Sequence, residues 1–197
     1  AISNGELTLY YQPIVSVTDK RLTGFDALVR WNHPRRGLVA PSRFIPLAEE
    51  TGLIIPLGQW VLREACRQMR QWEQEQPDAE DLTMSVNLST RQLAQRELSL
   101  YVAEVLEETG LPPCNLKLEI TESAFMNDSR SCLQVLRELK DLGVKLVVDD
   151  FGTGYSSLSY LQLMPLDMLK IDRSFISGKS CEESQQIVRT IIALARN

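Results

Sequence analysis

Two kinds of hydrophobic pattern alternate along this chain. Strand-like runs, in which apolar positions are continuous or alternate with polar ones, cover Leu7–Val17, Leu22–Trp31, Leu82–Leu88, Leu116–Ile120, Val144–Val148 and Met168–Ile171. Helix-like runs, with apolar residues three or four positions apart, cover Pro41–Thr51, Pro56–Glu75, Thr90–Thr109, Ser129–Leu142, Ser156–Gln162 and Glu182–Arg196. The pattern therefore predicts strands that alternate regularly with helices from Leu82 onward.

This alternation predicts the fold class. Strands that alternate with helices pair in parallel, and Glu119 and Asp149 stand about 30 residues apart, the length of one βαβ unit. Both an open doubly wound sheet and a (β/α) barrel fit such a pattern. No low-complexity stretch or linker interrupts the chain, so we expect one α/β domain over residues 1–197.

Polar side chains recur near the carboxyl end of these strands. Because alternate residues of a strand share a face, Asp26, Asn87, Glu119 and Asp149 fall in phase on one face, with Asp150 next in the chain. A single carboxylate at a strand end usually caps a helix or anchors a loop. Repetition on four strands instead predicts a functional site at the carboxyl ends of the sheet.

The chemistry of these side chains narrows the kind of site. All the donors are oxygens, which suit Mg²⁺ or Mn²⁺, with Ca²⁺ possible. Arg30 and Lys170 add positive charge on the same face. Carboxylates, a metal ion and two basic side chains around one pocket indicate metal-assisted chemistry on a phosphate ester.

Composition excludes several other classes. A formal net charge of −5 argues against DNA or RNA as partners. No apolar run is long enough to span a membrane and no signal-peptide pattern is present, so we expect a cytoplasmic protein. The four cysteines are scattered and His33 is the only histidine, which predicts reduced thiols and no zinc site. The chain opens at Ala1, so we expect it to be excised from a longer protein.

Seven segments carry a family resemblance. They are Tyr11–Val15, Phe25–Trp31, Phe44–Glu49, Val86–Ser89, Glu119–Glu122, Asp149–Leu158 and Leu169–Asp172. In this order they resemble the EAL domain family. The resemblance implies a TIM-like (β/α) barrel, of which this chain would hold about six of eight strands. It implies hydrolysis of cyclic di-GMP to linear pGpG with Mg²⁺ or Mn²⁺, a homodimer, and fusion to other signalling domains.

The resemblance also assigns the metal site by position. Asn87, Glu119 and Asp149 match metal ligands of the family, and Asp26 stands where the family motif has a glutamate ligand. Asp150 matches a residue that serves a second metal and takes part in catalysis.

Further positions match residues that act on the substrate. Lys170 matches the catalytic lysine that orients the attacking water, and Asp172 matches another polar member of the pocket. Gln12, Leu28 and Arg30 match ligand contacts, with Arg30 suited to a phosphate oxygen. Glu122 matches a residue that braces the loop after Asp150.

Two departures from the family pattern leave alternatives open. Asp26 is shorter than glutamate by one methylene, about 1.5 Å of reach. The chain also ends roughly 50 residues short of the ~250 of such a barrel, so we expect the 197-residue chain alone to lack the family's seventh-strand glutamate and to be inactive. The rivals to a phosphodiesterase are a degenerate cyclic di-GMP receptor and a purely structural interaction module.

Overall fold

The computed structural model describes residues 1–76, 79, 81–125, 129–152, 161, 163–177 and 182–195. The strands are β1 (Leu7–Val15), β2 (Leu22–His33), β3 (Gly37–Val39), β4 (Thr83–Leu88), β5 (Leu116–Thr121), β6 (Lys145–Phe151) and β7 (Met168–Ile171). The α-helices are α1 (Pro41–Thr51), α2 (Ile54–Glu75), α3 (Thr90–Leu93), α4 (Leu98–Thr109), α5 (Ser129–Asp141), α7 (Ser174–Ser177) and α8 (Glu182–Ala195). No helix in these ranges is long and apolar enough to cross a membrane.

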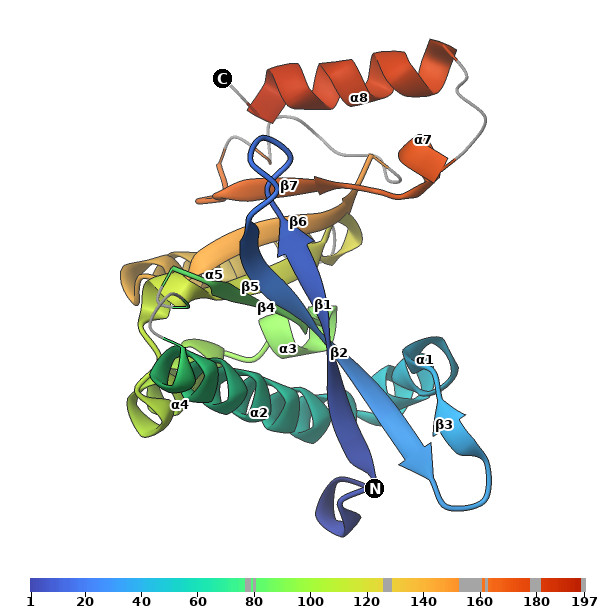
Figure 1. The fold of residues 1–197 in the computed structure, drawn as a ribbon, viewed down its shortest axis with the longest axis vertical. Helices are drawn as coiled ribbons and strands as arrows, with labels where there is room; N and C mark the ends of the chain where they lie inside the picture. The colour runs from blue at the N-terminus through green and yellow to red at the C-terminus, as the bar shows by residue number, and fades with distance from the viewer. Residues whose placement is uncertain are drawn as a thin grey trace.

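The strands form one mostly parallel sheet in the order β1-β2-β4-β5-β6-β7, with β3 paired to β2 (Figure 1). Pairing is parallel from β2 to β7, as the alternation predicts. Strand β1 differs, because it pairs with β2 in antiparallel. Only residues 16–21 separate these two strands, and so short a connection permits a hairpin but no parallel crossover.

One predicted helix is divided in two. The pattern over Thr90–Thr109 predicts a single helix, but the structure has α3 and α4 with a turn at residues 94–97 between them. Ser89 and Gln92 form a reciprocal capping box at the start of α3, and Gln92 is buried. This local anchor ends the first turn before the second helix begins. The predicted helix Ser156–Gln162 lies outside the described residues.

Helices cover the outer face of the sheet, and the polar side chains lie on the inner face. Leu116, Leu118 and Ile120, the predicted apolar face of β5, are fully buried in the core. On β2, Phe25 packs against Trp72 of α2 with ring centroids 4.7 Å apart. Asp26, the next residue, therefore points to the opposite, inner face.

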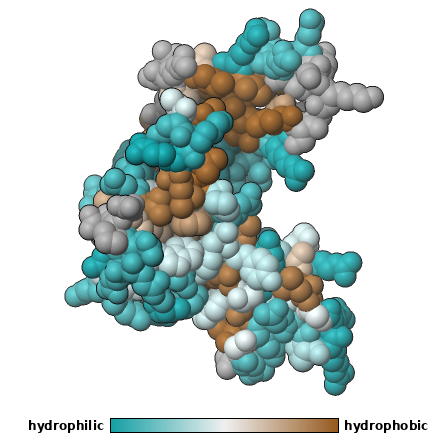
Figure 2. All heavy atoms as spheres, viewed as in Figure 1, coloured by the Kyte–Doolittle hydropathy of each residue, from teal (hydrophilic) through white to brown (hydrophobic). Residues whose placement is uncertain are grey.

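The sheet has two free edges in the described part of the chain, at β1 and β7, so the barrel is not closed. Apolar side chains remain exposed on and near β7, including Met168, Ile176, Ile187 and Ile192. In Figure 2, hydrophobic residues gather in the upper half of the view, over the region that Figure 1 shows around β7 and α8. The inner face of the sheet is thus open along its β7 side.

We expect Gly58→Ala to destabilise the protein. A Cβ at Gly58 would lie 2.0 Å from Nε2 of Gln92. Gln92 cannot easily move away, because its Oε1 accepts a hydrogen bond from the Ser89 amide at 3.1 Å. Overpacking of this kind costs about 1–3 kcal/mol. Urea unfolding should show this loss, whereas Gln59→Ala at an exposed neighbouring position should change stability by less than about 0.5 kcal/mol. Equal stability of the two variants would contradict the prediction.

Candidate functional site

The strand register gathers the polar side chains at the carboxyl ends of the sheet. Asp26 is level with Ser85, Asn87 with Glu119, and Thr121 with Asp149. Side chains at one level of neighbouring strands share a face, so the four oxygen donors all lie on the inner face. Asn87 lies two residues beyond the level of Asp26, and Asp149 lies two residues beyond the level of Glu119. Gln12 on β1 lies directly opposite Asp26.

Lys170 joins two of these carboxylates. Its Nζ donates to Oε2 of Glu119 at 2.5 Å and to Oδ2 of Asp26 at 3.3 Å. The Glu119 side chain is fully buried, and those of Asp26 and Lys170 are 17% and 28% exposed. The three come from β5, β2 and β7, so the structure brings together residues that are far apart in both sequence and sheet order.

Burial and the neighbouring charges together shift the pKa values of Glu119 and Lys170. Burial raises the pKa of Glu119, the nearby Asp26 carboxylate raises it further, and Lys170 only partly offsets both. Burial alone would lower the pKa of Lys170, but the charge and hydrogen bond of Glu119, with Asp26 and Asp149, raise it. Lys170 is therefore a firmly protonated cation among three carboxylates.

Asp149, Asp150 and Asp172 form a second group at the end of β6. The Asp150 amide donates to Oδ1 of Asp149 at 3.0 Å, and Asp150 has a left-handed backbone with φ of 53°. Burial, followed by the charge of Asp149 and a hydrogen bond with Asp172, raises the pKa of Asp150. The hydroxyl and amide of Ser174 donate to Asp172 and lower its pKa. Asp172 thus stays ionised more readily than Asp150.

Glu122 holds the chain just beyond β6. Its Oε2 accepts a hydrogen bond from the Gly152 amide at 3.0 Å. Gly152 has φ of +99°, and a Cβ there would lie 3.0 Å from the Phe175 ring. This contact falls at the start of the loop that the family resemblance associates with Glu122; residues 153–160 lie outside the described part of the chain.

The expected ligand contacts lie beside the carboxylates. Leu28 and Asn87 line a hollow of about 550 Å³ between the ends of β2 and β4 and helices α1 and α2. The Arg30 guanidinium lies over the Tyr10 ring, 5.4 Å from its centroid, and Nη1 donates to the Val29 carbonyl at 2.9 Å. Tyr10 is not among the predicted site residues, although its position two residues before Gln12 places it on the same face.

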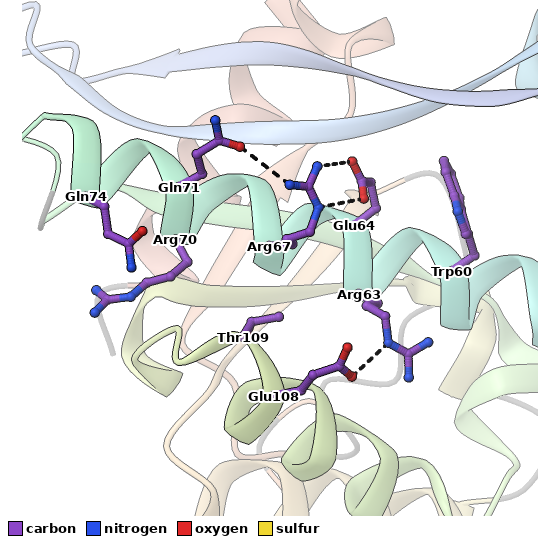
Figure 3. Close-up of a pocket in the computed structure, with 9 residues that line it drawn as sticks. All are labelled: Trp60, Arg63, Glu64, Arg67, Arg70, Gln71, Gln74, Glu108 and Thr109. Carbon is purple, nitrogen blue, oxygen red and sulfur yellow. Dashed lines mark hydrogen bonds and ion pairs between the residues drawn. The ribbon is translucent and has the colours of Figure 1, made fainter. Parts of the chain in front are cut away.

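A second hollow, of about 510 Å³, lies away from this cluster between α2 and α4 (Figure 3). Three arginines line it, and each is paired with a carboxylate, Arg63 with Glu108, Arg67 with Glu64 and Arg70 with Glu73. These pairs leave little net charge to attract a ligand. The carboxyl ends of the strands therefore remain the candidate site.

The donor set fits a hard cation. Oδ1 of Asp26 and Oε1 of Glu119 are buried and have no hydrogen-bond partner in the described structure. Buried polar atoms without partners are rare, and a cation beside the Asn87 amide would satisfy both. Within the described residues, no three His, Cys, Asp or Glu side chains already stand close enough to hold a metal. The amide and some side-chain adjustment would complete the coordination.

Comparison with known proteins agrees with this arrangement. MucR of Pseudomonas aeruginosa, a bifunctional diguanylate cyclase/cyclic di-GMP phosphodiesterase, is 45% identical over 197 residues, which are 100% of this chain and 28% of MucR. The cyclic di-GMP phosphodiesterase PdeR of Escherichia coli is 39% identical over 197 residues, covering 100% of this chain and 29% of PdeR. The chain thus spans under a third of the length of these two curated relatives.

Solved structures show the same fold. The PaMucR phosphodiesterase in complex with c-di-GMP superposes with a TM-score of 0.94 at 45% identity, covering 100% of this chain and 79% of that chain. The EAL enzyme Bd1971, in its cAMP- and cyclic-di-GMP-bound form, superposes with a TM-score of 0.91 at 38% identity, covering 98% of this chain and 53% of that chain. The TIM-like barrel expected from the sequence is therefore confirmed as the fold class, with the sheet unclosed in the part described. The EAL domain family model matches residues 1–197, and the chain belongs to that family.

Proposed function

We propose that this chain is part of a phosphodiesterase domain that hydrolyses cyclic di-GMP to linear pGpG. The observation that carries the proposal is the cluster of Asp26, Glu119 and Lys170 at the carboxyl ends of the parallel strands. Such a cluster combines acidic ligands for a cation with a charged donor at the place where this fold keeps its active sites. The similarity to relatives named as cyclic di-GMP phosphodiesterases supports the choice of substrate.

The proposed metal is Mg²⁺ or Mn²⁺. Oδ1 of Asp26 and Oε1 of Glu119 would bind it, together with Asn87 and Asp149. When bound, the ion supplies Lewis-acid stabilisation of charge on a phosphoryl oxygen. Asp150, whose raised pKa differs from that of its neighbour Asp172, is suited to accept a proton or to serve a second ion.

The protein's own side chains would bind and orient the substrate. Arg30, held against Tyr10, presents a guanidinium that suits a phosphate oxygen. Gln12 and Leu28 would contact the remainder of the ligand. Lys170 would donate a hydrogen bond to the attacking water and fix its direction. Glu122 would hold the end of β6, and with it Asp149 and Asp150, through the Gly152 amide.

A receptor that binds the nucleotide without cleaving it is the less favoured function. Asp26 is the one altered donor among those present, and it still keeps its contact with Lys170 at 3.3 Å. We further propose that the domain acts within a longer signalling protein, because the chain spans only 28% of MucR and 29% of PdeR. A homodimer is the assembly that the family resemblance implies.

We expect Asn87→Ala and Glu119→Gln to weaken metal binding. Asn87→Ala removes a proposed donor, and Glu119→Gln removes the negative charge of another. The dissociation constant for Mn²⁺ should rise by at least about 10-fold, since even supporting contacts of metal ligands are worth 10–100-fold. Isothermal titration of the purified protein with Mn²⁺ measures this. Asn32→Ala is the control, because Asn32 is an exposed asparagine that lies well beyond Asp26 along β2. If all three variants bind Mn²⁺ as the wild type does, the metal lies elsewhere.

A further inference from the structure

The lysine of the cluster reaches its partners across the sheet. Lys170 lies on β7, whereas Asp26 lies on β2, and β4, β5 and β6 stand between these strands in the sheet order. Only the curvature of the sheet brings the Lys170 ammonium within 3.3 Å of the Asp26 carboxylate. The ion pair is therefore a contact across the concave inner face rather than between neighbouring strands.

Two acidic side chains stand together at this point. Both Asp26 and Glu119 lie within 3.3 Å of the same ammonium, and the Glu119 side chain is fully buried. Two carboxylates this close in a poorly solvated place repel each other strongly. A cation between them removes that repulsion, and a buried carboxylate that loses its cation is strongly destabilising.

The four carboxylate oxygens of Asp26 and Glu119 divide into two that contact Lys170 and two that do not. Each carboxylate gives one oxygen to Lys170, Oδ2 from Asp26 and Oε2 from Glu119. The other oxygen of each, Oδ1 and Oε1, is buried and has no close hydrogen-bond partner in the described structure, although the Ser85 hydroxyl is near enough to Glu119 to lower its pKa. Lys170 therefore offsets one of the two negative charges of the pair, while one oxygen of each acid remains for a second cation.

We propose that the Lys170 ammonium is the resident cation of this carboxylate pair in the metal-free protein, and that it limits how tightly a divalent ion binds there. Its hydrogen bonds to both carboxylates hold Asp26 and Glu119 close together before any metal arrives. A divalent ion that binds to Oδ1 and Oε1 must then tolerate a positive charge a few ångströms away. The second half of this inference rests on the proposed metal site, whereas the first half concerns the metal-free protein alone.

The test compares two lysines in similar surroundings. Lys140 forms an ion pair with Asp167 at 2.7 Å and is 29% exposed, against 28% for Lys170, but it lies away from the cluster. We expect Lys170→Met, after removal of metal with a chelator, to lower Tm by about 5 °C or more. Lys140→Met should lower it much less, because Asp167 keeps its hydrogen bond from the Leu146 amide.

A second measurement follows the metal. In isothermal titration with Mn²⁺, Lys170→Met should bind at least about 10-fold more tightly than the wild type, because a like charge near the ion is gone. Mn²⁺ should also raise the Tm of this variant more than that of the wild type. An unchanged metal-free Tm, or weaker Mn²⁺ binding by Lys170→Met, would overturn the inference.

A double variant separates charge from packing. Adding Glu119→Gln to Lys170→Met removes the repulsion and should recover most of the lost stability. If Lys170→Met does not fold, rescue by Glu119→Gln supports the inference, and failure of the rescue overturns it, since lost packing would then be the cause. A wild-type protein that binds no Mn²⁺ would count against the proposed function, while the metal-free comparison would still decide the role of Lys170.

Discussion

In a longer protein that completes the barrel through its eighth strand, replacing Lys170 with alanine should lower kcat for cyclic di-GMP by about 10²–10⁴-fold while changing the dissociation constant of the nucleotide only slightly. The expected loss is that of a positioned hydrogen-bond donor that would orient the attacking water rather than bind the nucleotide. The ammonium is well held for this task, because Glu119 and Asp26 fix it by hydrogen bonds and their charge keeps it protonated.

The measurement is single-turnover hydrolysis at saturating Mn²⁺ together with equilibrium binding of cyclic di-GMP. Saturating Mn²⁺ is used because Lys170→Ala should change the affinity for the ion. When both proteins are fully loaded with Mn²⁺, a lower rate cannot reflect a difference in metal occupancy. Lys140→Ala is the control, since Lys140 pairs with Asp167 away from the cluster. An equal loss of binding and turnover would place Lys170 among the ligand contacts instead.

In the same longer protein, lengthening Asp26 to glutamate should raise kcat by a factor between several-fold and about 10²-fold, with little change in nucleotide affinity. Asp26 reaches Lys170 at 3.3 Å, which is longer than the usual ion-pair hydrogen bond of about 2.7–2.9 Å. One more methylene would add about 1.5 Å of reach. Glutamate should therefore meet both the lysine and the metal in better geometry than aspartate does.

Initial rates with Mg²⁺ and with Mn²⁺ test this expectation for both variants. Mn²⁺, which tolerates looser geometry, should partly rescue the aspartate form. Equal hydrolysis by the two variants would mean that Asp26 reaches the metal unaided. Binding without hydrolysis by both variants would favour the receptor over the phosphodiesterase.

The inner face of the sheet was largely predictable from the sequence. Period-two alternation put Asp26, Asn87 and Glu119 in phase, and parallel register does place them on adjacent strands at the carboxyl end. The face on which a strand residue lies follows from alternation within that strand alone, so the prediction holds wherever the strand is correctly identified. The side of the sheet on which a residue lies is thus readable from a few neighbouring positions.

Distances across that face were not predictable. That Lys170 bonds both Asp26 and Glu119 depends on how far the sheet curves between β2 and β7, which no local pattern encodes. The antiparallel start of the sheet, which sets Gln12 opposite Asp26, depends on the short hairpin connection rather than on strand pattern. The left-handed backbone of Asp150 is likewise imposed by its surroundings, because a non-glycine residue does not favour it.

The contact between Lys170 and Asp26 also bears on how the protein folds. It joins residues 144 positions apart, one in the second strand of the sheet and the other in the last described strand. Contacts of such long range form late, after loop closure has brought distant segments together. The ribosome would have to synthesise β7 before Asp26 and Glu119 could acquire their lysine. A nascent chain therefore passes through a stage in which the sheet has begun to form and its two acids are still without their counter-charge.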